Sequence, residues 1–60
     1  MVKPRIAVVI PAFNEEETIT KVIRNVSEYG MPIVVNDGST DNTKIRAQRA
    51  NAIVVNHVFN

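Results

Sequence analysis

Two polar stretches of the sequence carry the side chains that could do chemistry. They are FNEEET, residues 13–18, and NDGSTDN, residues 36–42, and each follows a run of β-branched residues. Carboxylates, amides and hydroxyls at this density can accept hydrogen bonds from a nucleobase or a ribose, or can hold a cation. The two stretches therefore define the candidate binding site.

Asp37 is the leading candidate in the second stretch. A helix is predicted after each stretch, and the free backbone N–H groups of a helix N-terminus favour a phosphate or another anion. Asp37 would itself be an anion at such a place. Its expected partners are therefore hydrogen-bond donors of a base or ribose, or a cation.

The same residues also allow purely structural interpretations. Residues 37–41 can form an Asx turn and cap the helix that follows, with Gly38 supplying an unusual backbone angle. Asn14 and Glu17 have the spacing of a capping box. Phe13 fits either the core or a stacking platform for a base. His57 fits a surface or hydrogen-bonded position better than a catalytic one.

The composition excludes several classes of protein. With no cysteine and one histidine, the chain cannot form a disulfide framework, a cysteine-based zinc site or a histidine cluster for a metal. Its two glycines form neither a dinucleotide-binding fingerprint nor a P-loop. A net charge of +1 with scattered basic residues gives no support for nucleic-acid or anionic-membrane binding. The first apolar run is too short for a signal peptide or a membrane span, which predicts a cytoplasmic protein.

Three β-branched runs must supply the strands that position these stretches. The first strand is expected within residues 5–13 and is expected to end at Pro11. The second is expected over residues 31–36, where Pro32 is tolerable because the start of a strand need not donate to the ladder. The third is expected over residues 52–56.

A helix is predicted between each pair of strands. The first is marked by an apolar stripe of helical period, with Asn14 as its cap and Gly30 as its stop; the stripe consists of Ile19, Val22, Ile23 and Val26. The second is expected from Ser39 or Thr40 to Ala50, followed by Asn51 in the left-handed conformation. Its stripe is weaker because Ile45 and Ala47 are two residues apart and cannot share a face.

The order strand, helix, strand, helix, strand predicts an α/β protein. Right-handed crossovers fold it into a Rossmann-like βαβαβ half-fold, a three-stranded parallel sheet in the order 3-2-1 with both helices on one face. The other face of the sheet has no helix, although the strands are apolar at consecutive positions. We expect that face to be covered by further polypeptide or by another copy of the chain, as in a homo-oligomer.

The motifs VVIPAFNEEETI and IVVNDGSTDNT together resemble the N-terminal signature of glycosyltransferase family 2, inverting enzymes with the A-type glycosyltransferase fold. The terminal VVNHVFN is similar to the polyprenyl-phosphate sugar transferase branch. The resemblance implies that Pro11 and Phe13 border the base of a nucleotide-sugar donor. It also implies that Glu15 accepts a hydrogen bond from the nucleoside and that Asp37 contacts the base or ribose.

For residues 1–60 the resemblance implies the donor-binding N-terminal portion of a longer enzyme, inactive alone. Such an enzyme transfers a sugar, with inversion, from a UDP- or GDP-linked donor to a lipid phosphate or a hydroxyl acceptor, and a lipid acceptor would bring it to the membrane surface. The family's Mg²⁺ or Mn²⁺ ligands and catalytic residues lie further along the chain, so none is assigned here. The sequence departs from the family pattern at Asn36, where an aspartate is usual, and at Ile45, which lies one place early.

Two other functions remain open at this stage. The first is a small dimeric nucleotide-binding module without catalysis. The second is a phospho-acceptor domain of flavodoxin-like order, which fits poorly because such domains carry the acceptor after the third strand, whereas Asp37 follows the second.

Overall fold

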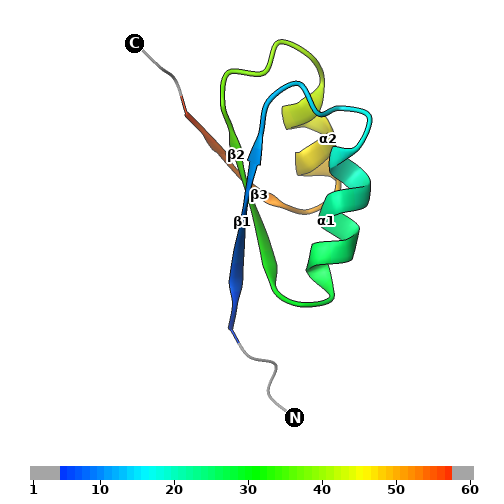
Figure 1. The fold of residues 1–60 in the computed structure, drawn as a ribbon, viewed down its shortest axis with the longest axis vertical. Coiled ribbons are helices and arrows are strands. Elements are labelled where there is room, and N and C mark those ends of the chain that lie inside the picture. The colour runs from blue at the N-terminus through cyan, green and yellow to red at the C-terminus, as the bar shows by residue number, and fades with distance from the viewer. Residues whose placement is uncertain (1–4, 58–60) are drawn as a thin grey trace.

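The computed structural model describes residues 5–57. Its elements alternate as expected: β1 (Ala7–Ala12), α1 (Ile19–Ser27), β2 (Met31–Asn36), α2 (Thr43–Arg49) and β3 (Ile53–Asn56). The strands form one parallel sheet in the order β1-β2-β3. Both helices lie on the same side of this sheet, and the loops that precede them meet at one end (Figure 1). The predicted α/β half-fold, its strand order and its one-sided helix layer are confirmed.

Pro11 lies inside β1, so the prediction that it ends the strand is wrong. The carbonyl of Ala12 accepts the Asp37 N–H at 2.9 Å, which directs the polar groups of Ala12 toward β2. Successive residues of a strand direct their backbone groups to opposite edges, so Pro11 faces the edge away from β2. A missing N–H costs no ladder hydrogen bond there.

Helix α1 begins later than the sequence predicts. Thr18 precedes its first residue without a side-chain cap, so the expected capping box of Asn14 and Glu17 is not formed. Asn14 adopts the left-handed conformation, with φ of 51°, and its side chain bonds to the other loop. Helix α2 likewise begins at Thr43 and not at Ser39 or Thr40.

The sequence predicts that Gly30 ends α1 in the left-handed conformation, and this prediction is wrong because its φ is not positive. Among the described residues, positive φ is found at Gly38, Asn14 and Asn51. A Cβ on Gly30 would instead collide with the carbonyl oxygen of Ile6, which accepts the Met31 N–H at 2.7 Å. Gly30 is therefore needed for close approach of the chain to the start of β1. The left-handed conformation predicted for Asn51 is confirmed, with φ of 67°, and Gly38 has the unusual backbone angle expected of it, with φ of 71°.

The core lies between the sheet and the two helices. Its buried apolar side chains are Ala12, Ile19, Ile23, Val34 and Ala47. Val22, predicted in the same stripe as Ile23, is 38% exposed, so the buried stripe of α1 is narrower than expected. Ala47 is fully buried while Ile45 is 47% exposed, as their spacing predicts.

The helix-free face of the sheet is exposed in the described chain, as predicted. Side chains of this face alternate with the buried ones along each strand. Val9, Met31, Ile53 and Val55 are 47–61% exposed. A contiguous apolar surface of this kind is typical of a face that packs against other protein.

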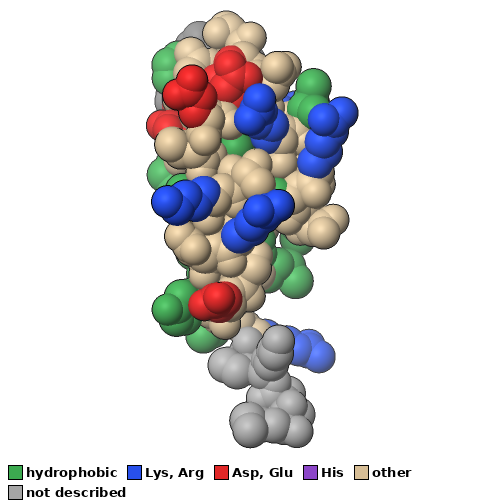
Figure 2. Space-filling model, turned by 90° about the vertical axis from the view of Figure 1, so that its right-hand side faces the viewer, with side chains coloured by type: hydrophobic (Ala, Val, Ile, Leu, Met, Phe, Trp, Pro, Cys, Tyr) green, Lys and Arg blue, Asp and Glu red, His purple; other side chains and the backbone are tan. Residues whose placement is uncertain are grey.

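The opposite, helical surface is charged. Figure 2 shows lysine and arginine side chains spread over the helices; most of the visible acidic side chains lie toward the end where the loops are, and another lies near the opposite end. Within residues 5–57, no helix has the length and apolar character needed to cross a membrane.

Candidate functional site

The two polar loops lie side by side at the carboxyl end of the sheet, and three N–H groups of the first loop donate to side chains of the second. Asn14 N–H donates to Ser39 Oγ at 3.0 Å. Glu15 N–H donates to Thr43 Oγ1 at 2.8 Å, and Glu16 N–H donates to Asp41 Oδ2 at 3.3 Å. Residues 14–16 are therefore held by the loop that precedes α2.

The second loop is held by the first in return. Thr40 N–H donates to Asn14 Oδ1 at 2.9 Å, and Asn42 N–H donates to Glu16 Oε2 at 3.2 Å. We call these five reciprocal hydrogen bonds the loop clasp. Thr43, which is fully buried, joins the clasp to α2, because its N–H and its hydroxyl both donate to Asp41 Oδ1.

The loop clasp corrects the expectation of free N–H groups for an anion at these loops. The N–H groups of residues 14–16 and of Thr40, Asn42 and Thr43 all donate to side chains. Side chains thus satisfy these particular donors, which a phosphate could otherwise use. These N–H groups instead hold the two loops together.

Hydrogen bonds, foremost from Thr43, lower the pKa of Asp41. Partial burial raises the pKa of Asp41, but hydrogen bonds from the Thr43 hydroxyl and from the N–H groups of Thr43, Glu16 and Asp41 itself outweigh it, so its pKa lies below the ordinary 3.8. A carboxyl whose pKa is lower in the folded than in the unfolded state stabilises the fold above the unfolded pKa. That contribution is lost as the pH falls through the lowered, folded value.

We therefore expect the free energy of unfolding to decrease as the pH falls below about 4, in part through Asp41. Urea denaturation between pH 2.5 and pH 7, read by circular dichroism, measures it. Asp41→Asn should make the decrease shallower, while Glu28→Gln, at the far end of α1, should leave the slope unchanged. An unchanged slope in Asp41→Asn would contradict the role given to this carboxylate.

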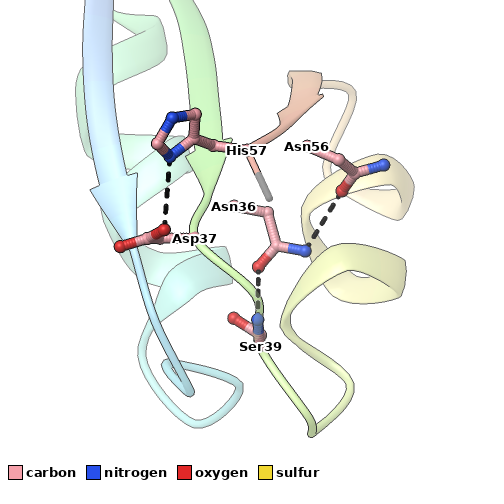
Figure 3. Close-up of polar contacts among 5 residues, drawn as sticks. All are labelled: Asn36, Asp37, Ser39, Asn56 and His57. Carbon is pink, nitrogen blue, oxygen red and sulfur yellow. Dashed lines mark hydrogen bonds and ion pairs between the residues drawn. The ribbon is translucent and has the colours of Figure 1, made fainter. Parts of the chain in front are cut away.

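Asp37 lies one residue beyond β2, where the ladder of the sheet continues. Its N–H donates to the Ala12 carbonyl at 2.9 Å, and the N–H of His57 donates to the Asn36 carbonyl at 2.9 Å. The side chains of Asp37 and His57 point toward one another, with His57 Nδ1 3.3 Å from Asp37 Oδ1 (Figure 3). The predicted surface, hydrogen-bonded placement of His57 is confirmed.

A second pair of side chains joins the same two strand ends. Asn36 is 6% exposed, and its Nδ2 donates to Asn56 Oδ1 at 3.2 Å. Its Oδ1 accepts the Ser39 N–H at 3.3 Å, which fixes the turn that follows Asp37 (Figure 3). An aspartate at position 36 could accept the bond from Ser39 but could not donate to Asn56.

The other predicted site residues lie around Asp37 in two groups. Pro11 and Phe13 come from the end of β1, next to β2 and Asp37, and the ring of Phe13 is 56% exposed. The stacking alternative for Phe13 is therefore open to it, and the core alternative is wrong. Glu15 lies further along the loop, with its Oε2 3.3 Å from Thr18 Oγ1.

Of the predicted site residues, only Glu15 lines a polar hollow in the surface. A polar hollow of about 310 Å³ is lined by residues 14–18 and Asp41, and so includes Glu15. Pro11, Phe13 and Asp37 do not line it. A larger, mainly apolar hollow of about 910 Å³ lies at the opposite end of the sheet, near Tyr29 and Met31.

The edge formed by the loops is acidic. Five of the chain's six carboxylate side chains belong to residues 15–17, Asp37 and Asp41. Among residues 5–57, however, no cluster of three or more acidic, histidine or cysteine side chains could hold a metal ion. The described residues therefore do not form the Mg²⁺ or Mn²⁺ site that the resemblance implies, and no step is assigned to a metal here.

The role of the third strand's end was missed by sequence reasoning. The tetrapeptide IVVN occurs at 33–36 and again at 53–56, and the two copies pair residue for residue in the sheet. The pairing places Asn56 opposite Asn36 and brings the side chain of His57 to that of Asp37.

The site's two motifs agree with a comparison with known families. The family model described as glycosyl transferase family 2 matches residues 7–60. The chain belongs to glycosyl transferase family 2. Both loops of the site, including Pro11, Phe13, Glu15 and Asp37, fall within the matched residues.

The relatives of this family 2 chain are much longer than the chain itself. MJ1222, an uncharacterised protein of Methanocaldococcus jannaschii, is 42% identical over 60 residues, which cover 97% of this chain and 25% of that protein. The glucosyl-3-phosphoglycerate synthase of Mycolicibacterium smegmatis is 46% identical over 55 residues, covering 83% and 18%. The chain thus spans about a quarter or less of these relatives.

A solved structure of the same kind of enzyme agrees with the fold. Glucosyl-3-phosphoglycerate synthase from Mycobacterium tuberculosis in complex with UDP superimposes with a TM-score of 0.79 at 46% identity, over 87% of this chain and 21% of that one. The same enzyme has been solved with Mn²⁺, UDP-glucose and phosphoglyceric acid, again with a TM-score of 0.79. This family 2 chain therefore has the fold of a nucleotide-sugar-binding glycosyltransferase.

Proposed function

We propose that residues 1–60 form the donor-binding portion of an inverting glycosyltransferase that uses a UDP-linked sugar. In this proposal Asp37 accepts hydrogen bonds from the base or ribose, Pro11 and Phe13 border the base, and Glu15 accepts from the nucleoside. The chain alone is inactive, because the metal ligands and the catalytic base come from residues outside 5–57.

The loop edge is rich in hydrogen-bond acceptors. This supports binding of the nucleoside part of the nucleotide sugar at this edge. The loop clasp uses several N–H groups that could otherwise receive a phosphate, and the carboxylates at this edge repel one. A base N–H and the ribose hydroxyls are neutral donors, which such an edge accepts. The diphosphate would then lie beyond the clasp and would need a cation for charge neutralisation.

The solvent exposure of the Asp37 and Phe13 side chains is consistent with nucleoside binding. The Asp37 side chain is 44% exposed although its N–H is fixed to β1, so the carboxylate is presented on a rigid backbone. The half-exposed ring of Phe13 follows the neighbouring strand. An aromatic face beside a carboxylate offers stacking and hydrogen bonding to one planar base.

The relatives support the identity of the sugar donor more directly than that of the sugar acceptor. The Mycobacterium tuberculosis enzyme has been solved with UDP and with Mn²⁺ and UDP-glucose, which favours UDP over GDP for this chain. The acceptor in our proposal is a hydroxyl or a lipid phosphate, and a lipid would bring a cytoplasmic enzyme to the membrane surface. Mg²⁺ or Mn²⁺ would neutralise the leaving diphosphate.

The test is calorimetric titration of UDP into the purified protein, as it is naturally encoded, with Mn²⁺ present. Asp37→Asn keeps the shape of the side chain but removes its charge and turns one acceptor into a donor, so we expect UDP affinity to fall by at least about tenfold. Glu28→Gln, a matched loss of one carboxylate far from the loops, should bind UDP like the original protein. Equal affinity of Asp37→Asn and the original would refute the role of Asp37.

The exposed sheet face favours one other function, a dimeric nucleotide-binding module without catalysis. Sedimentation of the same protein and its turnover of UDP-glucose separate the two. UDP binding by a dimer that transfers no sugar to any acceptor would support the module, whereas sugar transfer would exclude it.

A further inference from the structure

We propose that His57 is a positioning residue for Asp37, and that the end of β3 thereby sets the geometry of nucleoside binding. This inference rests on the donor-binding role proposed for Asp37. It adds a residue from a third strand to a site that the sequence places on the first two strands only.

The direction of the hydrogen bond follows from the two groups involved. His57 Nδ1 lies 3.3 Å from Asp37 Oδ1, and a carboxylate can only accept. Nδ1 must therefore carry the hydrogen and donate it. With Oδ1 held by the imidazole, the second oxygen of Asp37 is left to accept from the base or ribose.

The backbone around this pair is fixed independently of the His57 side chain. The N–H of His57 donates to the Asn36 carbonyl, and the Asn36 side chain bonds to Asn56 and to the Ser39 N–H. The first two bonds attach the end of β3 to Asn36, directly before Asp37, and the third closes the turn directly after it. Substitution at position 57 should therefore change the Asp37 carboxylate without dissolving the strand ends that carry it.

Because the pair is exposed to solvent, the His57 imidazole restricts the orientation of the Asp37 carboxylate but adds little to the stability of the fold. The side chains of His57 and Asp37 are 52% and 44% exposed, so the pair contributes little to folding. A free Asp37 carboxylate could rotate between several orientations, and binding a nucleoside would have to select one. A bond from His57 removes part of that cost before the ligand arrives.

Two substitutions at position 57 distinguish a directed hydrogen bond from mere side-chain bulk. The amide nitrogen of asparagine can occupy the place of Nδ1, so His57→Asn can still donate to Asp37. His57→Leu keeps comparable volume but donates nothing. In calorimetric titration of the naturally encoded protein with UDP, we expect His57→Leu to bind about fivefold more weakly, and His57→Asn to stay within about twofold of the original.

A double-mutant cycle shows whether His57 acts through Asp37. If it does, His57→Leu should have no further effect on UDP affinity in an Asp37→Ala background, where residue 37 has no side-chain acceptor left for His57. A loss of the same size in both backgrounds would mean a general structural effect and would overturn the inference, as would an undiminished affinity of His57→Leu.

The same titrations separate failure of the inference from failure of the proposed function. If Asp37→Asn weakens UDP binding while His57→Leu does not, Asp37 keeps its role and only the positioning by His57 is wrong. If Asp37→Asn binds UDP like the original protein, the proposed function of Asp37 fails and the role of His57 fails with it.

Discussion

Thr43→Val is expected to destabilise the protein although the two side chains have nearly the same shape. Thr43 is fully buried, and its hydroxyl accepts the Glu15 N–H and donates to Asp41. Valine removes the acceptor of the part-buried Glu15 N–H and the hydroxyl donor to Asp41, and loss of hydrogen bonds at such a site costs about 1–3 kcal/mol. Urea denaturation followed by circular dichroism measures the loss, and UDP affinity should fall with it because the loop clasp loosens.

Thr40→Val is the matched control for this prediction. Thr40 is exposed, and its hydroxyl lies 3.4 Å from Asn14 Oδ1, while its backbone N–H makes the shorter bond to the same atom. The backbone bond survives the substitution, so the free energy of unfolding should change by less than about 0.5 kcal/mol. Equal losses in the two variants would show that the buried hydroxyl of Thr43 has no special role.

Ile23→Ala should have the largest effect on stability. Ile23 is completely buried between α1 and the sheet, where it packs with Ile19, Val34 and Ala47. Truncation of a buried isoleucine to alanine costs about 2–5 kcal/mol, through lost burial and the cavity left behind. Small domains have a total stability of comparable size, so the variant should be largely unfolded in thermal denaturation near room temperature.

Ile45→Ala in α2 is the control for Ile23→Ala in α1. Ile45 is 47% exposed, so Ile45→Ala removes little buried surface and places a better helix former in α2. We expect its midpoint of thermal unfolding to stay within a few degrees of the original. A large loss in Ile45→Ala would instead indicate that this surface of α2 is covered by protein outside residues 5–57.

The strands could be predicted from the sequence because their signal is local. Runs of β-branched residues gave the bounds of β2 without error and those of β3 to within one residue. The buried residues Ile19 and Ile23 were likewise expected from their spacing. Handedness of the crossovers then determined the strand order and the shared side of the helices.

The helix starts were wrong because their capping residues serve another purpose. Asn14 has the right chemistry for a helix cap, but its side chain bonds to Thr40, 26 residues away. Glu16 and Asp41 are recruited across the loops in the same way. No pattern within a short window distinguishes a residue that caps its own helix from one that caps a neighbour's.

The candidate site was predicted in part for a related reason. Asp37, Phe13 and Pro11 are recognisable from the motifs in which they stand. The partner of Asp37 depends on the register between β2 and β3, which the motifs do not state. The satisfied N–H groups of the loops could not be foreseen either, because they depend on contacts between the two motifs.

The loop clasp has a consequence for how the site forms during folding. Each of its five hydrogen bonds joins residues 25 to 28 positions apart, so none can form until α1 and β2 have brought the loops together. Closing such a segment costs chain entropy before any of the bonds is made. The edge formed by the two loops should therefore appear in one late, cooperative step, and no partly folded chain should present part of it.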